Sequence, residues 1–344
     1  MRPAPSALRR KSNLCAAFAT KPKNTNMKKV LRYLLFTVLG LVVLVGLAAS
    51  FVAVRGIPTQ KAQHIDLKVD PTPARLARGE QLASLLCKSC HLDPNTNKFT
   101  GKRLDDAPQF GSIYSRNITQ HPEFGIGKWS DGDLAYLLRT GVRPDGTYIP
   151  LMVALKESSD EDIYSIIAFL RSGHTWVQPD NTRQPQTKYS FLTKFLTNAG
   201  ILLKPGTYPT KPIPQPDTTN KAAWGRYIAL QLDCWVCHSK DFLKLDSDHP
   251  ENSLGYFGGG NALKTPDGKD IFSRNLTMDE ATGIGRWSEA DFLRAVKFGQ
   301  APAGQPALRE PMPKFSTLSD AETRAIFAYL KTVPKISNPV ERKF

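Results

Sequence analysis

The longest uninterrupted apolar run in the chain lies near its N-terminus. Residues 33–54 contain no charged side chain. As a helix this run would be roughly 33 Å long, which is enough to cross the hydrocarbon core of a bilayer. The pattern therefore predicts one transmembrane helix over residues 30–55.

Beyond this run, apolar positions recur at helical spacing in short segments that are separated by long loops. Residues 75–86 form the first such segment, and strand signals are few. Serine stands where several of these helices would begin, and glycine stands where two of them would end. The predicted N-caps are Ser130, Ser159, Ser288 and Ser319, and the predicted C-terminal glycines are Gly141 and Gly299. The pattern predicts an all-α fold whose long loops surround something other than protein.

Several motifs occur twice at nearly constant separation. S-R-N-[IL]-T is found at 115–119 and at 273–277, and G-I-G-x-W-S is found at 125–130 and at 283–288. A period this long indicates a duplicated domain. We expect the first domain at 72–172, a proline-rich linker at 173–218 and the second domain at 219–334.

The linker contains a further apolar segment, residues 189–203, which predicts a short docked helix. Such a helix could cap a domain, or it could contact the membrane or a partner. We expect this helix to cap a domain, which is the simplest of these roles.

Charge divides the chain at the apolar run. The chain has 46 Lys+Arg and 31 Asp+Glu, and residues 1–55 hold ten of the cations and none of the acids. The remaining residues are therefore only mildly basic, which excludes nucleic acid as a partner. Nine of the ten cations precede the run, so residues 1–29 form a basic segment that the positive-inside rule places in the cytoplasm.

A cleaved signal peptide is the alternative to an anchor, because small residues stand at 47–50. Signal peptides usually have an apolar core of about 7–15 residues, which is shorter than this run. We therefore expect an uncleaved anchor with residues 56–344 outside the cytoplasm. Met27 is a second candidate for the first residue.

Four of the five cysteines belong to two Cys-x-x-Cys-His motifs, at 87–91 and 234–238. This motif is the attachment signature of c-type haem, in which both thiols form thioethers and the histidine binds the iron. A zinc ribbon would pair its two Cys-x-x-Cys units at about 15–20 residues. We predict two covalent haem c groups. The attachment residues are Cys87, Cys90, Cys234 and Cys237, and the proximal iron ligands are His91 and His238.

The sixth ligand of each iron separates a carrier from an enzyme. Met152 and Met312 occupy matching places shortly before the last helix of each copy, whereas Met278 aligns with Gln120. Methionine is often core filler. A matched pair on proline-containing loops favours Met152 on the first iron and Met312 on the second. Two strong axial ligands exclude oxygen, so we expect an electron carrier without catalytic residues.

Other residues near these motifs have alternative roles. His121 is a rival ligand if Met152 does not bind the iron. The paired residues Arg116 and Arg274 could donate to haem propionates, as could Trp129 and Trp287. Otherwise the arginines are solvated and the tryptophans fill the core.

Residues 72–334 resemble tandem class I cytochrome c domains. They resemble more narrowly the cytochrome c subunits of membrane-bound bacterial dehydrogenases for alcohols and gluconate. The likeness is carried by the two Cys-x-x-Cys-His motifs, both pairs of repeated stretches, Arg78-Gly79-Glu80, Gly258-Gly259-Gly260 and Glu310-Pro311-Met312-Pro313. Those subunits usually carry three haem domains, whereas this chain has two such motifs.

The resemblance implies a di-haem cytochrome c on the outer side of the bacterial inner membrane. Its partners would be a dehydrogenase or quinol-oxidising donor and an oxidase or cytochrome acceptor. A di-haem subunit of a terminal oxidase and a di-haem peroxidase are the alternatives. A peroxidase requires an exchangeable sixth site, which two matched methionines argue against.

Overall fold

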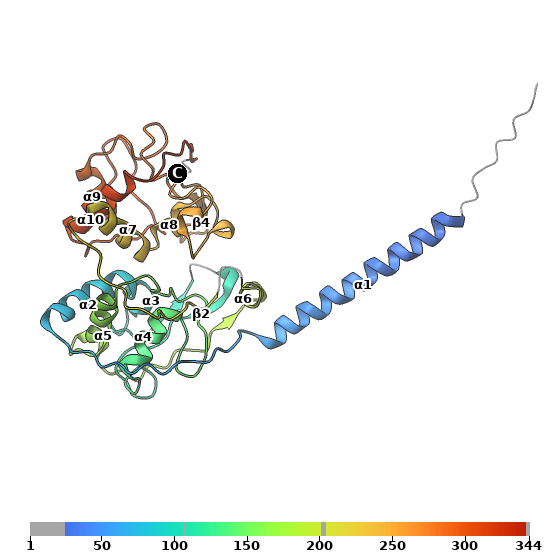
Figure 1. Ribbon diagram of the computed structural model, residues 1–344, viewed down its shortest axis with the longest axis horizontal. Coiled ribbons are helices and arrows are strands. Elements are labelled where there is room, and N and C mark those ends of the chain that lie inside the picture. Colours follow the sequence, from blue (N-terminus) through green and yellow to red (C-terminus); the bar gives the residue numbers. More distant parts are fainter. Residues whose placement is uncertain (1–24, 106–107, 201–203, 342–344) are drawn as a thin grey trace, which may run out of the picture. The chain divides into compact units, whose positions relative to one another are not determined.

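The computed structural model describes residues 25–105, 108–200 and 204–341 (Figure 1). Most of the predicted basic segment, including Cys15, lies outside the described residues, as do positions 201–203 of the predicted linker helix. The chain divides into two compact units, Met1–Phe51 and Val52–Phe344.

The first unit contains most of helix α1 (Thr25–Arg55), and the last turn of α1 belongs to the second unit. Within the described residues, Met27–Arg55 is the one helical stretch long and apolar enough to cross a membrane. The predicted apolar helix is thus confirmed, and its length and composition suit an anchor or a signal sequence.

Most of the regular secondary structure in the rest of the described chain is helical, as predicted, and long loops join the helices. The helices are α2 (Pro73–Leu86), α3 (Lys88–His91), α4 (Asp131–Thr140), α5 (Asp160–Leu170), α6 (Phe191–Asn198), α7 (Lys221–Gln231), α8 (Cys234–His238), α9 (Glu289–Phe298) and α10 (Asp320–Leu330). Short 3₁₀ turns lie at Pro108–Phe110, Thr175–Val177, Phe242–Lys244 and Pro250–Asn252.

Five short strands among the described residues modify the all-α expectation. They are β1 (Arg103–Leu104), β2 (Gly111–Tyr114), β3 (Lys188–Tyr189), β4 (Ala262–Lys264) and β5 (Asp270–Phe272). Both sheets are antiparallel, with the order β1-β2-β3 in one and β4-β5 in the other. Leu104 pairs with Ile113, and Leu263 pairs with Ile271.

The predicted helix ends are confirmed. Ser130 and Ser288 each form a full capping box with the aspartate three residues later. Gly141 and Gly299 end these helices with φ of 73° and 74°, the left-handed conformation that glycine adopts without strain.

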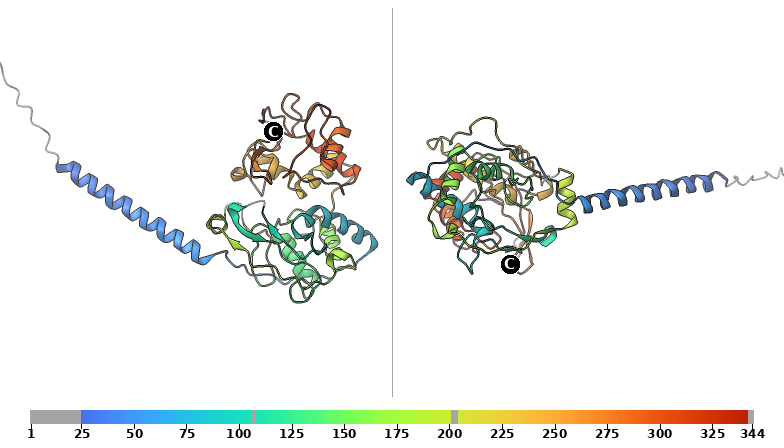
Figure 2. Two further views of the ribbon diagram at one scale, coloured as in Figure 1. Left: turned by 180° about the vertical axis from the view of Figure 1, so that it is seen from behind. Right: turned by 90° about the horizontal axis from the view of Figure 1, so that it is seen from below.

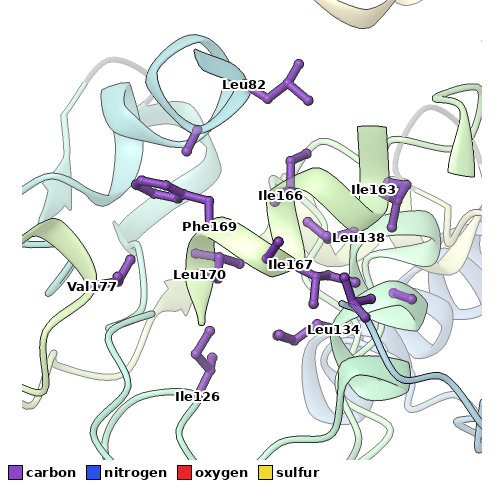
Figure 3. Close-up of a cluster of buried hydrophobic side chains, with 14 of the residues drawn as sticks. Leu82, Ile126, Leu134, Leu138, Ile163, Ile166, Ile167, Phe169, Leu170 and Val177 are labelled. Carbon is purple, nitrogen blue, oxygen red and sulfur yellow. The ribbon is translucent and has the colours of Figure 1, made fainter. Parts of the chain in front are cut away.

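Two helix pairs form two hydrophobic cores. In the first core α2 packs on α5 with Leu82, Ile166 and Phe169 buried (Figure 3). In the second core α7 packs on α10 in the same way (Figures 1 and 2). Each pair meets at a glycine. A Cβ at Gly79 would lie 1.9 Å from the carbonyl oxygen of Ser165, and a Cβ at Gly225 would lie 1.8 Å from that of Ala325.

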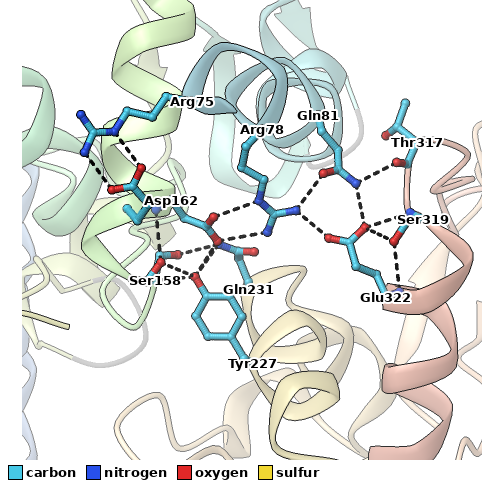
Figure 4. Close-up of polar contacts among 12 residues, drawn as sticks. Arg75, Arg78, Gln81, Ser158, Asp162, Tyr227, Gln231, Thr317, Ser319 and Glu322 are labelled. Atoms are coloured by element: carbon cyan, nitrogen blue, oxygen red, sulfur yellow. Dashed lines mark hydrogen bonds and ion pairs between the residues drawn. The ribbon is translucent and has the colours of Figure 1, made fainter. Parts of the chain in front are cut away.

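A polar network lies between the two cores (Figure 4). Arg78 on α2 binds Asp162 in the first turn of α5 (Nε–Oδ1 2.9 Å) and Glu322 in the first turn of α10 (Nη1–Oε1 2.6 Å). Both carboxylates are buried. Tyr227 and Gln231 of α7 also donate to Asp162. We call these residues, together with Gln81, the junction network.

The network explains why the N-cap at Ser159, unlike that at Ser319, does not form a full capping box. Ser319 and Glu322 form a full capping box. In the first copy the backbone N–H of Asp162 donates to the hydroxyl of Ser159, but the carboxylate of Asp162 does not accept from the backbone N–H of Ser159. The carboxylate of Asp162 binds Arg78 instead, because that partner carries a full charge.

Acid should weaken the fold through Asp162. Burial alone would raise the pKa of this carboxyl, but the hydrogen bond and charge of Arg78 and the donors on α7 lower it. A carboxylate with a lowered pKa contributes its full stability above the unfolded value of about 3.9, and loses it as pH falls through the folded value. We expect the free energy of unfolding to fall below about pH 4, and Asp162→Asn to flatten that fall, in urea titrations of the haem-loaded protein.

The matched control is Asp267→Asn on the exposed β4–β5 turn. Solvent screens that carboxylate, so its removal should leave the acid limb in place. An Asp162→Asn protein with an unchanged acid limb would contradict the prediction.

Candidate haem sites

Each Cys-x-x-Cys-His motif forms one short helical turn at the end of a longer helix. α2 runs into Cys87, whose N–H donates to the carbonyl of Ala83 at 2.9 Å, and α3 then carries Cys90 and His91. In the second copy α8 begins at Cys234 and ends at His238, after α7. A spacing of three on a helix places both thiols on one face, as attachment to one ring edge requires.

The histidines are held by matched hydrogen bonds. Nδ1 of His91 lies 2.8 Å from the carbonyl oxygen of Arg116, and Nδ1 of His238 lies 2.8 Å from that of Arg274. A carbonyl only accepts, so Nδ1 carries the proton and Nε2 has the free lone pair that binds a metal. Burial lowers the pKa of both imidazoles, which keeps them neutral.

The S-R-N-[IL]-T stretch builds the turn that presents this carbonyl. Oδ1 of Asn117 accepts from the backbone N–H and the hydroxyl of Thr119, and Asn275 binds Thr277 identically. The hydroxyl of Ser115 donates to the carbonyl of Cys90 at 2.6 Å, which joins the turn to the first cysteine motif. Repetition was the sequence signal for this stretch, but its role is evident only from the structure.

The four thiols of the motifs are free, since none of them forms a disulfide. Burial raises the pKa of Cys87 and of Cys234 to about 12, which keeps these two thiols protonated. Zinc binds thiolates, and the described residues hold no cluster of three or more His, Cys, Asp or Glu side chains that could bind an ion.

Matched apolar side chains border both cores at these motifs. Ile118 and Trp129 are half-buried against the first core, and the equivalent Leu276 and Trp287 are half-buried against the second. A flat apolar group beside each cysteine motif would cover them. With the free Nε2 atoms and the free thiols, the residues present fit a covalently attached haem at each motif.

Three cations gather beside the first motif. Burial and the charges of Arg143 and Arg183 lower the pKa of Arg116, and Asp145, which pairs with Arg143 at 3.5 Å, offsets only one of the three positive charges. Arg143 also lies over the ring of Trp129, 5.7 Å from its centroid. This cluster suits the two carboxylates of a haem.

The two predicted methionines have the same kind of backbone turn, but only Met152 is among the described residues that pack on the hydrophobic core of its copy. The N–H of Met152 bonds the carbonyl of Ile149, and that of Met312 bonds the carbonyl of Arg309, so both stand in the same turn. Met152 packs on the first core. Met278, which has no methionine counterpart in the first copy, packs on the second core.

Sequence reasoning missed Arg139, which fixes the loop that carries Met152. Its guanidinium is buried, donates to the carbonyls of Leu155, Lys156 and Ser158, and pairs with Asp160 at 2.6 Å. The second copy has a lysine at this place, Lys297, which pairs with Asp320. Only the matched cations at the ends of α4 and α9 marked these positions in the sequence.

The rival ligand His121 has a local role. Its Nδ1 accepts from the backbone N–H groups of Glu123 and Phe124, and its ring stacks on Phe124. It therefore stabilises the turn before the G-I-G-x-W-S stretch.

Comparison with known proteins finds relatives that are named as cytochromes or cytochrome subunits. It is 30% identical over 283 residues to the fructose dehydrogenase cytochrome subunit of Gluconobacter japonicus, covering 77% of this chain and 55% of that relative. It is 30% identical over 273 residues to the gluconate 2-dehydrogenase cytochrome c subunit of Pantoea cypripedii, covering 76% and 60%. It is 27% identical over 270 residues to a di-haem cytochrome c of Cereibacter sphaeroides, covering 73% and 82%.

No protein-family model matches the chain. The chain spans little more than half the length of the dehydrogenase subunits that it matches, and most of the length of the di-haem cytochrome. Its matched region includes most of the described residues beyond α1. The chain is therefore homologous to the cytochrome c subunits of membrane-bound dehydrogenases and to a di-haem cytochrome c.

Proposed function

We propose that the chain is a membrane-anchored di-haem cytochrome c that transfers electrons. Residues 72–172 and 219–334 would each surround one haem c, joined by the linker 173–218, with the anchor at 30–55 and the basic segment 1–29 in the cytoplasm. The observation that carries the proposal is the duplicated site, in which each motif histidine donates from Nδ1 to the carbonyl of a matched arginine.

Each part of the site has a task in this function. A bound haem supplies reversible one-electron chemistry at its iron. Cys87 and Cys90 hold it in the first site, as Cys234 and Cys237 do in the second. The carbonyl behind each histidine fixes the ring and makes Nε2 a stronger donor. Met152 would bind the first iron and Met312 the second, and each would close its iron to small molecules.

The relatives' names support a partner. Because two of them are cytochrome subunits of dehydrogenases, we propose that electrons come from a dehydrogenase or a quinol-oxidising donor. They would leave to an oxidase or another cytochrome, on the outer side of the bacterial inner membrane. The chain would thus be a carrier within an oxidoreductase complex.

Carbon monoxide tests whether both irons are closed. The reduced protein, made in a host that attaches haem c, should contain two haems per chain by alkaline pyridine assay. Its absorption spectrum should not change when carbon monoxide is added, because both axial positions of each iron are filled. Met152→Ala and Met312→Ala should each make one of the two haems bind carbon monoxide.

Met278→Ala is the matched control, because that methionine packs on the second core and is not the repeated residue. It should leave the carbon monoxide spectrum unchanged. If it opens a haem while Met312→Ala does not, the second ligand is Met278. A wild-type haem that binds carbon monoxide would favour the peroxidase, and copurification with an oxidase core would favour the terminal-oxidase subunit.

A further inference from the structure

Helix α6, in the linker, has an exposed apolar face. Phe191, Leu192 and Phe195 are 49%, 42% and 45% exposed. Residues three and four positions apart lie on one side of a helix, so Phe195 is close to both Leu192 and Phe191, and the two phenylalanine ring centroids are 6.3 Å apart. Thr193 and Leu196 are buried on the other side. The predicted docked helix thus has one face on the protein and a second face that nothing in the described chain covers.

The end of α1 is tied to α6. Nζ of Lys194 donates to the carbonyl of Ala53 at 3.0 Å, and Nδ2 of Asn198 donates to the carbonyl of Gly56 at 2.8 Å. These two acceptors belong to the last turn of α1 and the residue after it, where carbonyls have no partner within the helix. α6 therefore lies where the apolar helix ends.

The chain just beyond α1 is fixed to a small hydrophobic cluster around Tyr136 and Tyr148. The N–H of Gln60 donates to the carbonyl of Gly146 at 2.8 Å, and Ile57 packs with Tyr136 and Tyr148. In the first turn of α6, the hydroxyl of Thr193 donates to the carbonyl of Phe110 at 2.8 Å. α6 is thus bonded both to the end of α1 and to the segment that ends at Phe110.

We propose that Phe191, Leu192 and Phe195 insert into the interfacial layer of the lipid bilayer in which α1 is anchored. The inference rests on the anchored form of the proposed function. Continuity supports lipid as the occupant, since the apolar face lies at the end of a helix long enough to span a membrane. Charge supports it too: Lys188 and Lys194 stand beside the apolar face and residues 188–198 hold no acid, which suits anionic headgroups.

The contact would give the anchor a second attachment point. A single helix followed by a free tether would let the haem domains turn in all directions. With α6 on the bilayer, the first core keeps one face toward the membrane. Membrane-bound donors would then meet a restricted set of orientations, which raises the effective concentration of the productive one.

Thiol protection in nanodiscs tests the insertion. The full haem-loaded chain carries Cys15→Ser, so that one introduced cysteine is its only free thiol. Leu192→Cys and Phe195→Cys are compared with Phe298→Cys on α9, where the native side chain is 47% exposed. In nanodiscs with anionic lipid, a charged impermeant maleimide should label positions 192 and 195 at least about tenfold more slowly than position 298. Labelling in urea normalises the intrinsic reactivities.

The two possible failures are distinct. If the chain co-elutes with the nanodisc and all three thiols react at similar rates, the lipid contact is overturned while the anchor stands. That result would leave the face of α6 to a protein partner. If the haem-loaded chain does not co-elute with the nanodisc, the anchor and the lipid contact are both overturned.

Discussion

Replacing Arg139 with methionine should destabilise the first core and loosen the loop that carries Met152. The guanidinium of Arg139 is 1% exposed and is the donor to three loop carbonyls and to Asp160. The methionine side chain has similar length but offers no donor. Asp160 is 25% exposed, so the loss comes mainly from the buried loop carbonyls that lose their donor, and we expect about 3 kcal/mol. Urea unfolding of the haem-loaded protein measures this loss.

The same variant should also open the first iron. When the loop loses its anchor, Met152 is no longer held in one place, so one of the two reduced haems should bind carbon monoxide. A merely structural role elsewhere in the core would lower stability without this spectral change. The spectrum therefore tests Arg139 as a positioning residue.

Lys297→Met is the matched control in the second copy. Lys297 pairs with Asp320 at 2.6 Å, but Asp320 is 54% exposed, and such a pair contributes at most about 1 kcal/mol. We expect a small loss of stability and no new carbon monoxide binding. If Arg139→Met lowered the free energy of unfolding no more than Lys297→Met, the loop that carries Met152 would not depend on the hydrogen bonds of Arg139.

The features that were predictable from the sequence are those set by nearby residues. Ser130 with Asp133 at the start of α4, and Gly141 at its end, act within one helix, so their signals are visible in the sequence alone. The cysteine motifs are equally local. The domain limits that the repeat indicates, because the same local signals recur in the same order, stay a prediction.

The features that were not predictable depend on partners far along the chain. Asp162 has the sequence of a capping residue, but its carboxylate binds Arg78, which is 84 residues away. From the sequence alone Arg139 has the pattern of a solvated helical residue, because its acceptors lie in the loop at 155–158. No local pattern contains these contacts.

The arginines of the S-R-N-[IL]-T stretches were partly predictable and partly not. Their repetition indicated a function, and the side chain was the natural candidate for it. The structure adds a role for the backbone, since the carbonyl of Arg116 accepts from His91. A hydrogen bond from a backbone atom leaves almost no trace in residue identity, because any residue offers a carbonyl.

Replacing Arg78 with methionine should separate the two cores into independent thermal units. Arg78 bridges the carboxylates of Asp162 and Glu322, which are 2% and 4% exposed. Without it both carboxylates are buried near each other with no cation between them. We expect the free energy of unfolding to fall by about 3–5 kcal/mol. In calorimetry of the haem-loaded protein, a single transition should become two.

Arg75→Met on the same helix is the matched control. Arg75 makes two hydrogen bonds to Glu161, at 2.7 and 2.9 Å, but that carboxylate is 42% exposed and belongs to the same core. Its removal should cost at most about 1 kcal/mol and leave the number of transitions unchanged. Arg78→Lys should behave like Arg78→Met in the number of transitions, because an ammonium cannot bind two carboxylates through separate edges as a guanidinium does. If Arg78→Met kept one transition at the wild-type temperature, the cores would be coupled by their apolar contacts, such as that of Leu85 with the second core, and not by the junction network.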